Sequence, residues 1–511
     1  MSTSTDTAVD HEILIVGAGF SGMGTAIELD RAGVHDFRIL DAGDGLGGTW
    51  RCNTYPGVAV DFPVFSYQFS FEQRSDWSRV YAPGSEVLEY AEHCADKYGL
   101  RSRMRFDTKI DGIEFEGHTN RWRVTTAAGD TMTARFVVNA TGSFPEPNIP
   151  KFNGIENFAG PVLHTARWDP AVDLTGKRVG IVGTGASGVQ LAAAVAAEVA
   201  QLTVFQRTPV WVVPKYDAPL SARLHWMFEH VPLLKPAIRA LSQAYIETVV
   251  LLPAQYHKLF PLTKLAAVAL RRELAAQVHD PAVRDKLTPR YALGCKPPAY
   301  SNAYLSMFNR ENVYLETDPI DKVTTDGVRT AEGVEHELDV LILATGFKMP
   351  FTSGVPFRCV GSDGIDLHEY WSRERTQAYQ GVSVPGFPNY FSVSGPYSYN
   401  GSSYFNLIEA SAEHIARCLG HARRTGATRV EVTQQANTKY FEEMLRRRWR
   451  QVFWQDTCGL ANAYYVDVNG DVPLRPTLSL ETAWRSARFP LSDYRFETTP
   501  ASETVEQHTQ V

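Results

Sequence analysis

The chain has 511 residues, of which 44% are hydrophobic, so it can bury more than one core and we expect two or three folded domains. Its net charge of −7 arises from 50 basic and 57 acidic residues, with no long block of either sign. This balance argues against a nucleic-acid partner and favours a small-molecule one.

The chain shows no sign of membrane insertion or secretion. No stretch approaches the roughly 18 uncharged apolar residues that a spanning helix needs. The first ten residues are polar and lack the apolar core of a signal peptide, so we expect a cytoplasmic protein with reduced thiols. The six cysteines are scattered, without a CxxC pair or a His/Cys cluster at metal spacing. Neither structural zinc nor a disulfide framework is therefore expected.

The predicted elements begin with a buried strand at residues 12–16. It leads directly into the sequence GAGFSG at residues 17–22 and then into a helix over residues 23–32. In this setting Gly17 permits a tight turn, Gly19 lets the backbone approach a pyrophosphate, and Gly22 lets the helix pack closely on the strand. The helix N-terminus then offers amides and a partial positive charge to the phosphates.

A second strand, residues 37–40, ends at Asp41, which lies 24 residues after Gly17 (41 − 17 = 24). An acid at this point accepts hydrogen bonds from ribose hydroxyls and repels a 2′-phosphate. The first fingerprint therefore favours FAD or NAD over NADP.

A turn-rich run over residues 47–61 follows, with Gly48, Trp50 and the carboxylate of Asp61. By itself it is compatible with a structural loop that ends in a solvated Asp. A strand at residues 136–139 then runs into a small-residue turn, as expected where the chain leaves a nucleotide-binding half.

Residues 158–169 carry His164 and Trp168, four positions apart. This spacing would stack the two side chains on one side of a helix, or leave them lining a linker near a ligand. Spacing alone is also typical of an ordinary surface loop with a packed Trp.

A second fingerprint, GTGASG at residues 183–188, follows a strand at 177–182 and precedes an alanine-rich helix over 189–199. After the next strand, Arg207 lies 24 residues past Gly183 (207 − 183 = 24), in the place that Asp41 holds in the first unit. An arginine there pairs with a 2′-phosphate. The opposite charges predict FAD at the first fingerprint and NADPH at the second.

The rest of the chain completes these two units. Residues 221–286 lose strand patterning and predict helices broken by prolines, whose apolar face could border a substrate entrance or a membrane but more simply packs on the neighbouring domain. A strand at 341–343 repeats the pattern of 136–139. We therefore predict an α/β fold with two Rossmann-like dinucleotide-binding domains and a helical insertion. The predicted parts are 1–150 (FAD domain, first part), 151–215 (NADPH domain, first part), 216–293 (insertion), 294–346 (NADPH domain, second part) and 347–511 (FAD domain, second part, and C-terminal tail).

The stretch at 158–169 fits the pattern F-x-G-x-x-x-H-x-x-x-W-[P/D] at every fixed position, and residues 47–61 fit G-G-x-W-x4-Y-P-G-x3-D throughout. With its two fingerprints the chain resembles the type I Baeyer–Villiger monooxygenases, flavoproteins that insert one oxygen atom of O₂ beside a carbonyl. The resemblance implies that NADPH reduces FAD, that O₂ forms a C4a-peroxyflavin, and that retained NADP⁺ protects it from water. The partners implied are O₂ and a small organic substrate.

The resemblance also implies roles for particular residues. Asp61 would sit beside the flavin, Arg207 and Thr208 would hold the NADPH 2′-phosphate, and Lys296 would reach the same cofactor. His164 would position the linker that couples the two cofactors. The predicted cofactor-binding residues are Gly17, Gly19, Gly22, Asp41, Gly48, Trp50, Asp61, Gly183, Gly185, Ser187, Gly188, Arg207, Thr208 and Lys296. An aromatic, apolar substrate site is expected from Phe62, Phe65, Tyr67, Tyr397, Tyr399 and Tyr404.

The chain departs from the family where an arginine normally partners the active-site Asp. The family shows Gly-x-Lys-Arg, whereas this sequence reads GCKPP at 294–298 and places Pro297 at the arginine. Losing such a charge costs roughly 3–4 kcal/mol of transition-state stabilisation. Lys296 and Arg290 are candidate replacements and join Asp61 and His164 as predicted catalytic residues. The alternative is S- or N-oxygenation or hydroxylation by the same flavin.

Two other classes share parts of the pattern. A flavin disulfide reductase needs a redox cysteine pair after the first fingerprint, where Cys52 stands alone. A non-oxygenating NADPH-binding flavoprotein is compatible with the proline at 297.

Overall fold

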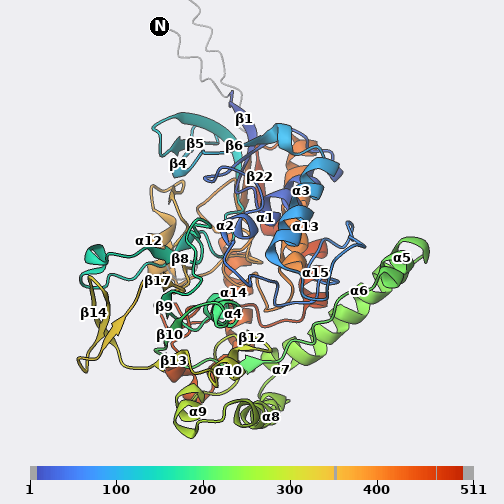
Figure 1. Ribbon diagram of the computed structural model, residues 1–511. Helices are drawn as coiled ribbons and strands as arrows, with labels where there is room; N and C mark the ends of the chain where they lie inside the picture. Colours follow the sequence, from blue (N-terminus) through green and yellow to red (C-terminus); the bar gives the residue numbers. More distant parts are fainter. Residues whose placement is uncertain (1–7, 350–353, 468, 499–511) are drawn as a thin grey trace, which may run out of the picture.

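The computed structural model describes residues 8–349, 354–467 and 469–498 (Figure 1). The expected C-terminal tail beyond residue 498 lies outside the described residues. Two large sheets, the first mixed and the second wholly parallel, organise the described chain, and each is built around one glycine fingerprint. The predicted α/β class with two dinucleotide-binding units is thereby confirmed.

The first sheet contains the first fingerprint and runs in the order β19-β4-β5-β6-β1-β2-β3, with β20 paired to β6. Strand β1 (His11–Val16) lies parallel between β2 (Phe37–Leu40) and β6 (Thr131–Asn139). Its last four residues are buried, as expected for a strand covered on both faces. Strands β19 (Arg358–Val360) and β20 (Tyr390–Ser392) join from the C-terminal part of the chain.

Three helices share the largest buried core, beside this sheet. They are α1 (Phe20–Arg31), α3 (Gly84–Lys97) and α13 (Tyr404–Thr425), and Figure 1 shows the blue N-terminal helices beside the orange C-terminal one. The first sheet therefore depends on a helix from the C-terminal part of the chain, α13, to cover it.

The second sheet is wholly parallel in the order β13-β10-β9-β17-β8. Strand β9 (Arg178–Val182) leads into α4 (Ala186–Val195), and β10 (Gln201–Phe205) follows. Strand β17 (Val340–Leu343) returns to the centre from beyond the helical insertion. The edge strand is β8 (Val162–His164), so the stretch at 158–169 is neither a helix nor a plain loop: its middle adds a strand to this sheet.

The predicted helical insertion consists of α5 (Ala222–His230), α6 (Leu234–Tyr245), the π-helical η3 (Ile246–Leu251), α7 (Leu252–Gln255), α8 (Leu262–Gln277) and α9 (Pro281–Leu287). In Figure 1, α5 and α6 run along one side of the molecule, where α6 contacts the first unit: Ser242 lies 2.6 Å from Ser66, and Arg239 donates to the Gln68 carbonyl at 2.7 Å. No residue of α6 is buried, and Leu233, Leu241 and Leu265 are 79%, 67% and 72% exposed. Packing on a neighbouring domain therefore accounts for less of its apolar surface than the sequence suggested.

The remaining elements are shorter or lie at the periphery. Their bounds are α2 (Thr49–Cys52), η1 (Arg101–Arg103), β3 (Met104–Arg105), β4 (Ile110–Glu116), β5 (Arg121–Thr126), β7 (Glu146–Pro147), η2 (Ile155–Asn157), β11 (Val212–Val213), β12 (Ala299–Tyr300), α10 (Tyr304–Met307), β13 (Val313–Glu316), β14 (Ile320–Thr324), β15 (Gly327–Thr330), β16 (Glu335–Glu337), β18 (Phe347–Lys348), α12 (Leu367–Glu374), β21 (Arg429–Val432), α14 (Gln434–Arg448), η4 (Val452–Trp454), η5 (Asp456–Ala461), α15 (Ser479–Arg488), η6 (Leu491–Asp493) and β22 (Tyr494–Glu497).

One disulfide corrects the expectation that all thiols are reduced. Cys295 and Cys458 are joined, with their Cα atoms 5.0 Å apart although 163 positions separate them in the sequence. The other four cysteines are free. Such a pair was not foreseeable from spacing, because the fold alone brings η5 against the segment at 294–298.

None of the described helices combines the length and the apolar character that crossing a membrane requires.

Candidate functional site

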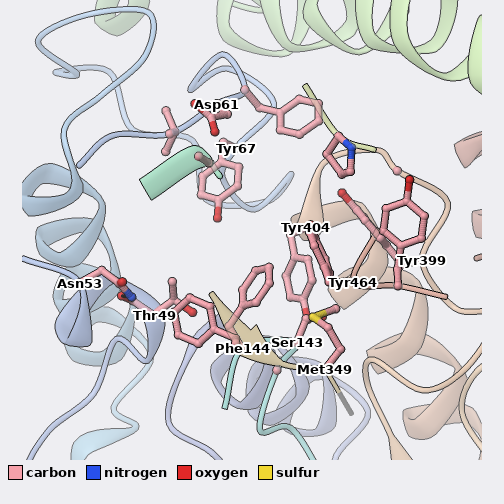
Figure 2. Close-up of a pocket in the computed structure, with 18 of the residues that line it drawn as sticks. Thr49, Asn53, Asp61, Tyr67, Ser143, Phe144, Met349, Tyr399, Tyr404 and Tyr464 are labelled. Carbon is pink, nitrogen blue, oxygen red and sulfur yellow. Dashed lines mark hydrogen bonds between the residues drawn. The ribbon is translucent and has the colours of Figure 1, made fainter. Parts of the chain in front are cut away.

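A cavity of about 1700 Å³ lies where the first fingerprint, the helical insertion and the C-terminal loops meet. Its walls include Gly17 and Asp41 of the first unit, Ala186 of the second, Val249 of the insertion and Pro297. Figure 2 shows Asp61 and Tyr67 on one side and Tyr399, Tyr404 and Tyr464 on another, around a common space.

The first fingerprint has the tight geometry that its glycines predict. Gly17 has φ of +115°, and a Cβ on it would lie 2.5 Å from the Ala140 carbonyl oxygen. A Cβ on Gly22 would lie 1.9 Å from the Gly17 carbonyl oxygen, so only glycine lets α1 approach β1 this closely. The backbones of Gly19 and Gly48 lie against each other, and both residues line the cavity. The cradle fits the pyrophosphate of a dinucleotide.

Asp41 follows β2 and borders the cavity beside this cradle. Its Oδ2 accepts a hydrogen bond from the Ala18 backbone N–H at 2.6 Å, and its Oδ1 accepts one from Gly43 at 2.8 Å. These bonds fix the carboxylate at the end of the strand, where remaining lone pairs are available to ribose hydroxyls.

The second fingerprint repeats the geometry with more open space. A Cβ on Gly188 would lie 2.2 Å from the Gly183 carbonyl oxygen, whereas a Cβ on Gly185 would meet nothing within 4 Å. The backbone at Gly185 is thus accessible to a ligand. Ser187 lies next to Gly188 in the first turn of α4.

Two cations lie near the end of β10. Arg207 is exposed, and Lys296 is half-buried close enough for Arg207 to act on it. Burial, together with this neighbouring guanidinium, lowers the pKa of Lys296. Thr208 accepts a hydrogen bond from Asn462 at 2.9 Å. Neither cation forms an ion pair with a carboxylate of the described residues, so together they make a candidate site for a multiply charged anion.

Asp61 ends the run at 47–61 and lines the cavity, as Figure 2 shows. Lys215 lies 3.0 Å from its Oδ1, and Gln190 donates to the same oxygen at 3.1 Å. Tyr55 donates to the Gln190 side-chain carbonyl at 2.9 Å. Burial raises the pKa of Asp61, while Lys215 and Gln190 act in the opposite direction.

The two cations proposed to replace the family arginine lie elsewhere. Arg290 has a side chain that is 80% exposed, pairs with Asp285 at 3.6 Å and is not among the cavity-lining residues, so it cannot partner Asp61 in this arrangement. Lys296 shares its surroundings with Arg207 and is likewise outside the lining. Pro297 itself lines the cavity.

Aromatic side chains form much of the cavity wall. Of the residues expected there, Phe62, Tyr67, Tyr399 and Tyr404 line the cavity, whereas Phe65 and Tyr397 do not. Tyr300 and Tyr464 also line it. The Tyr404 hydroxyl lies 3.0 Å from Ser143 Oγ, and Tyr399 donates to the Ser402 carbonyl at 2.8 Å. Burial raises the pKa of Tyr399 and that of Tyr404, so these hydroxyls are neutral donors.

His164 ends the edge strand β8 and is 4% exposed. Its Nδ1 accepts a hydrogen bond from the Ala166 backbone N–H at 3.1 Å, and its ring meets that of Phe347 edge-on at 6.1 Å. Burial and Arg167 lower the pKa of His164, so the ring is neutral. The side chain thus packs where β8 meets the crossing segment after β17, and it does not line the cavity.

Sequence reasoning missed the partners of Asp61. Lys215 follows β11, and Gln190 lies in α4, 129 positions from Asp61. Lys215 lies in no recognisable motif, and in the sequence Gln190 is a single polar residue within an apolar helical stretch. Only Tyr55, inside the run at 47–61, had a motif that could have pointed to this site.

Comparisons with known proteins agree with this geometry. Residues 14–258 match the family described as pyridine nucleotide-disulphide oxidoreductase. A Baeyer-Villiger monooxygenase of Streptomyces coelicolor is 33% identical, over 94% of this chain and 92% of that protein. A Baeyer-Villiger monooxygenase of Pseudomonas aeruginosa is 35% identical, over 98% of this chain and 94% of that protein.

Solved structures extend the likeness to the fold. A crystal structure of OTEMO in complex with FAD and NADP has a TM-score of 0.85 and 27% identity, covering 96% of this chain and all of the other. An ε-caprolactone-bound cyclohexanone monooxygenase has a TM-score of 0.79 and 29% identity, covering 95% and 99%.

Proposed function

Because the chain belongs to the Baeyer–Villiger monooxygenase family, we propose that it uses FAD and NADPH to insert one atom of O₂ beside the carbonyl of an organic ketone, giving an ester or a lactone. The second oxygen atom leaves as water, and NADPH supplies the two electrons. The observation that carries the proposal is one cavity that joins a dinucleotide cradle, a half-buried carboxylate and an aromatic wall.

The first fingerprint is the proposed FAD site. Gly17, Gly19 and Gly22 would receive the pyrophosphate at the start of α1, and Asp41 would hold the adenosine ribose. Gly48 and Trp50 would border the cofactor on the other side, since both line the same cavity. FAD, reduced by NADPH, supplies the activation of O₂.

The second fingerprint is the proposed NADPH site. Gly183, Gly185, Ser187 and Gly188 would receive its pyrophosphate at the start of α4. Arg207, Thr208 and Lys296 would bind the 2′-phosphate, because two clustered cations discriminate NADPH from NADH.

The substrate is proposed to be a small, largely apolar ketone. Tyr67, Tyr404 and Tyr464 would surround it, and their hydroxyls would donate to the carbonyl or the developing alcohol oxygen. Asp61 would hold a fixed negative charge at the edge of this space, and the surrounding rings would exclude water. The lactone bound in the cyclohexanone monooxygenase structure supports this substrate class.

We also propose that Pro297 stands where relatives carry their arginine. Its place in the cavity wall supports this, and it leaves no cation on that wall segment. Without the cation, oxygen transfer to sulfur or nitrogen would be the competing outcome. The variant Pro297→Arg, assayed with a ketone and with a thioether, tests this proposal. If the ester yield and the ratio of ester to oxygenated thioether are both unchanged, Pro297 does not affect the choice of reaction.

The domain division 1–150, 151–215, 216–293, 294–346 and 347–511 remains our proposal for how these sites are assembled. Its support is that β19 and β20 join the first sheet while β13 and β17 join the second. His164 would act as a positioning residue between the two units, since its ring packs on Phe347 after β17.

The proposal is tested by loading the purified protein with FAD and following NADPH oxidation with a panel of cyclic and linear ketones. We expect ester or lactone formation, a clear preference for NADPH over NADH, and weak NADPH oxidation without substrate. Protein that takes up no FAD, or that oxidises NADPH without any oxygenated product across the panel, would contradict it.

A further inference from the structure

The ionic partner of Asp61 comes from an unexpected place in the fold. Lys215 lies 3.0 Å from the Asp61 carboxylate and donates to the Val60 carbonyl oxygen at 3.0 Å, so its ammonium group bridges the carboxylate and the backbone beside it. Its side chain is 11% exposed and lies 5.5 Å from the centre of the Tyr81 ring. A lysine this well enclosed is held in one geometry.

The backbone of Lys215 is fixed as firmly as its side chain. Its N–H donates to the Asn302 side chain at 2.8 Å, and Asn302 donates back to its carbonyl at 2.8 Å. Strand β11, which ends two residues before Lys215, pairs with β12, which begins two residues after Pro297. The segment that carries the proline therefore runs beside the segment that carries the lysine.

Within the described chain, five ionisable groups act on Asp61, and Lys215 is the one that carries a positive charge. The other four are tyrosines that burial keeps neutral: Tyr55, Tyr67, Tyr81 and Tyr300. The Asp61 side chain is half-buried, and a carboxylate in such a place takes up a proton more readily when it has no cation beside it. The charge of Asp61 therefore depends on Lys215, with Gln190 adding a neutral hydrogen bond.

We propose that Lys215 is the positioning residue that keeps Asp61 ionised and aimed at the cavity, and that it supplies, from the segment after β11, the positive charge missing at Pro297. The inference rests on the proposed function for its role in oxygen insertion. Lys215 acts through Asp61, because Asp61 lines the cavity and Lys215 does not. It also joins the two units, since Asp61 follows the first fingerprint while Lys215 and Gln190 follow the second.

The test compares Lys215→Met and Lys215→Arg in the FAD-loaded enzyme. We expect Lys215→Met to lower the rate of ester formation by about 10²–10³-fold, as for loss of a preorganised charge partner, and Lys215→Arg to retain most of it. Flavin reduction by NADPH should change little in either, because the cations at the second fingerprint are untouched. The acid limb of the pH–rate profile should move to higher pH in Lys215→Met, since Asp61 then protonates more readily.

A matched control is Lys235→Met. Lys235 also comes from the region after the second fingerprint and donates to a backbone carbonyl of the first unit, that of Gln73 at 3.1 Å, but it has no carboxylate partner among the described residues. It should behave like the unaltered enzyme. Restoration of ester formation by Pro297→Arg in the Lys215→Met background would further support the exchange of cations.

Several results would overturn the inference. Equal activity of Lys215→Met and Lys235→Met would do so, as would equal loss in Lys215→Met and Lys215→Arg with an unmoved pH profile. If Lys215→Met does not fold, Lys215→Gln keeps a hydrogen-bond donor without the charge, and the same fall in ester formation and the same shift of the pH profile are expected of it.

A readout without turnover separates this inference from the proposed function. Infrared difference spectra should show the carbonyl stretch of a protonated carboxylic acid in Lys215→Met at neutral pH, absent from the unaltered enzyme and from the double variant with Asp61→Asn. If this band appears but the unaltered enzyme forms no ester, the proposed oxygen insertion is refuted while the role of Lys215 toward Asp61 stands. If the band is absent from Lys215→Met, the proposed role of Lys215 toward Asp61 is refuted, whatever the enzyme does with ketones.

Discussion

Asp41 and Arg207 follow equivalent strands, β2 and β10, and their opposite charges suit different nucleotides. Both were predictable from the sequence, because a Rossmann strand fixes where its last residue lies relative to the glycine turn. Lys215 was not predictable, since its contact with Asp61 depends on the pairing of β11 with β12 and on how the two units meet. Arg290 was predicted as a cation for the site but lies in solvent, because nearness in sequence to Pro297 does not set the direction of a side chain.

Removal of the Arg207 guanidinium should change the choice of nicotinamide nucleotide. A charge-assisted hydrogen bond contributes about 1.5–3 kcal/mol, so Arg207→Ala should lower kcat/KM for NADPH by roughly 10- to 100-fold while that for NADH changes little. Steady-state kinetics with both nucleotides measure this. Arg290→Ala, which alters an exposed arginine outside the cavity, is the control. An equal fall with NADPH and NADH would contradict a 2′-phosphate role.

Two glycines of the second fingerprint should respond differently to alanine. Gly188→Ala places a Cβ 2.2 Å from the Gly183 carbonyl oxygen, so the helix must move and stability should fall by about 1–3 kcal/mol. Gly185→Ala meets nothing within 4 Å and should leave stability unchanged within about 0.5 kcal/mol, yet weaken NADP⁺ binding. Thermal unfolding and NADP⁺ titration separate the two effects. Unweakened NADP⁺ binding by Gly185→Ala would argue against a pyrophosphate at this turn.

At the scale of elements, the helical insertion differs most from expectation. The proline-broken sequence predicted helices, and helices α5 to α9 are present, but periodicity could not say which partner their apolar faces meet. Residues of η3 and α8, such as Val249 and Leu262, border the cavity while staying 54% and 46% exposed. The insertion therefore forms the mouth of the site, the entrance role that the sequence left open.

The disulfide between Cys295 and Cys458 ties η5 to the segment that carries Lys296 and Pro297. The Tyr465 hydroxyl donates to the Cys295 carbonyl, and Asn462 donates to Thr208, so the same C-terminal stretch contacts the proposed NADPH site. A covalent tie at this point restricts the loop that holds Lys296.

Breaking this tie should destabilise the protein and loosen the NADPH site. Closure of a long loop by a disulfide contributes about 2–4 kcal/mol, so Cys458→Ser should lower the free energy of unfolding by that amount and raise KM for NADPH. Thiol titration of the unreduced, denatured protein should find four free cysteines. Titration of six thiols, or a Cys458→Ser variant with unchanged stability, would show that the pair does not form in solution. Cys418→Ser, at a buried free cysteine, is the comparison.

At the scale of the whole molecule, the chain crosses twice between two sheets. It leaves the first after β6, builds the second from β8 to β17, and returns to complete the first with β19 and β20. Two fingerprints 166 residues apart (183 − 17) were enough to predict this plan. The cavity between the units was not predictable in detail, because its walls are contributed by many separate stretches of sequence, from Val16 to Leu474, whose meeting depends on docking.

The most direct test of the whole account is a turnover under oxygen-18 gas. FAD-loaded protein, NADPH and a ketone that the enzyme accepts are incubated with labelled O₂, and the product is analysed by mass spectrometry against NADPH consumed. The account predicts an ester or lactone that carries one labelled oxygen, formed in equal amount to the NADPH oxidised. NADPH consumption without labelled ester, or label found only in oxygenated thioethers or amines, would contradict it.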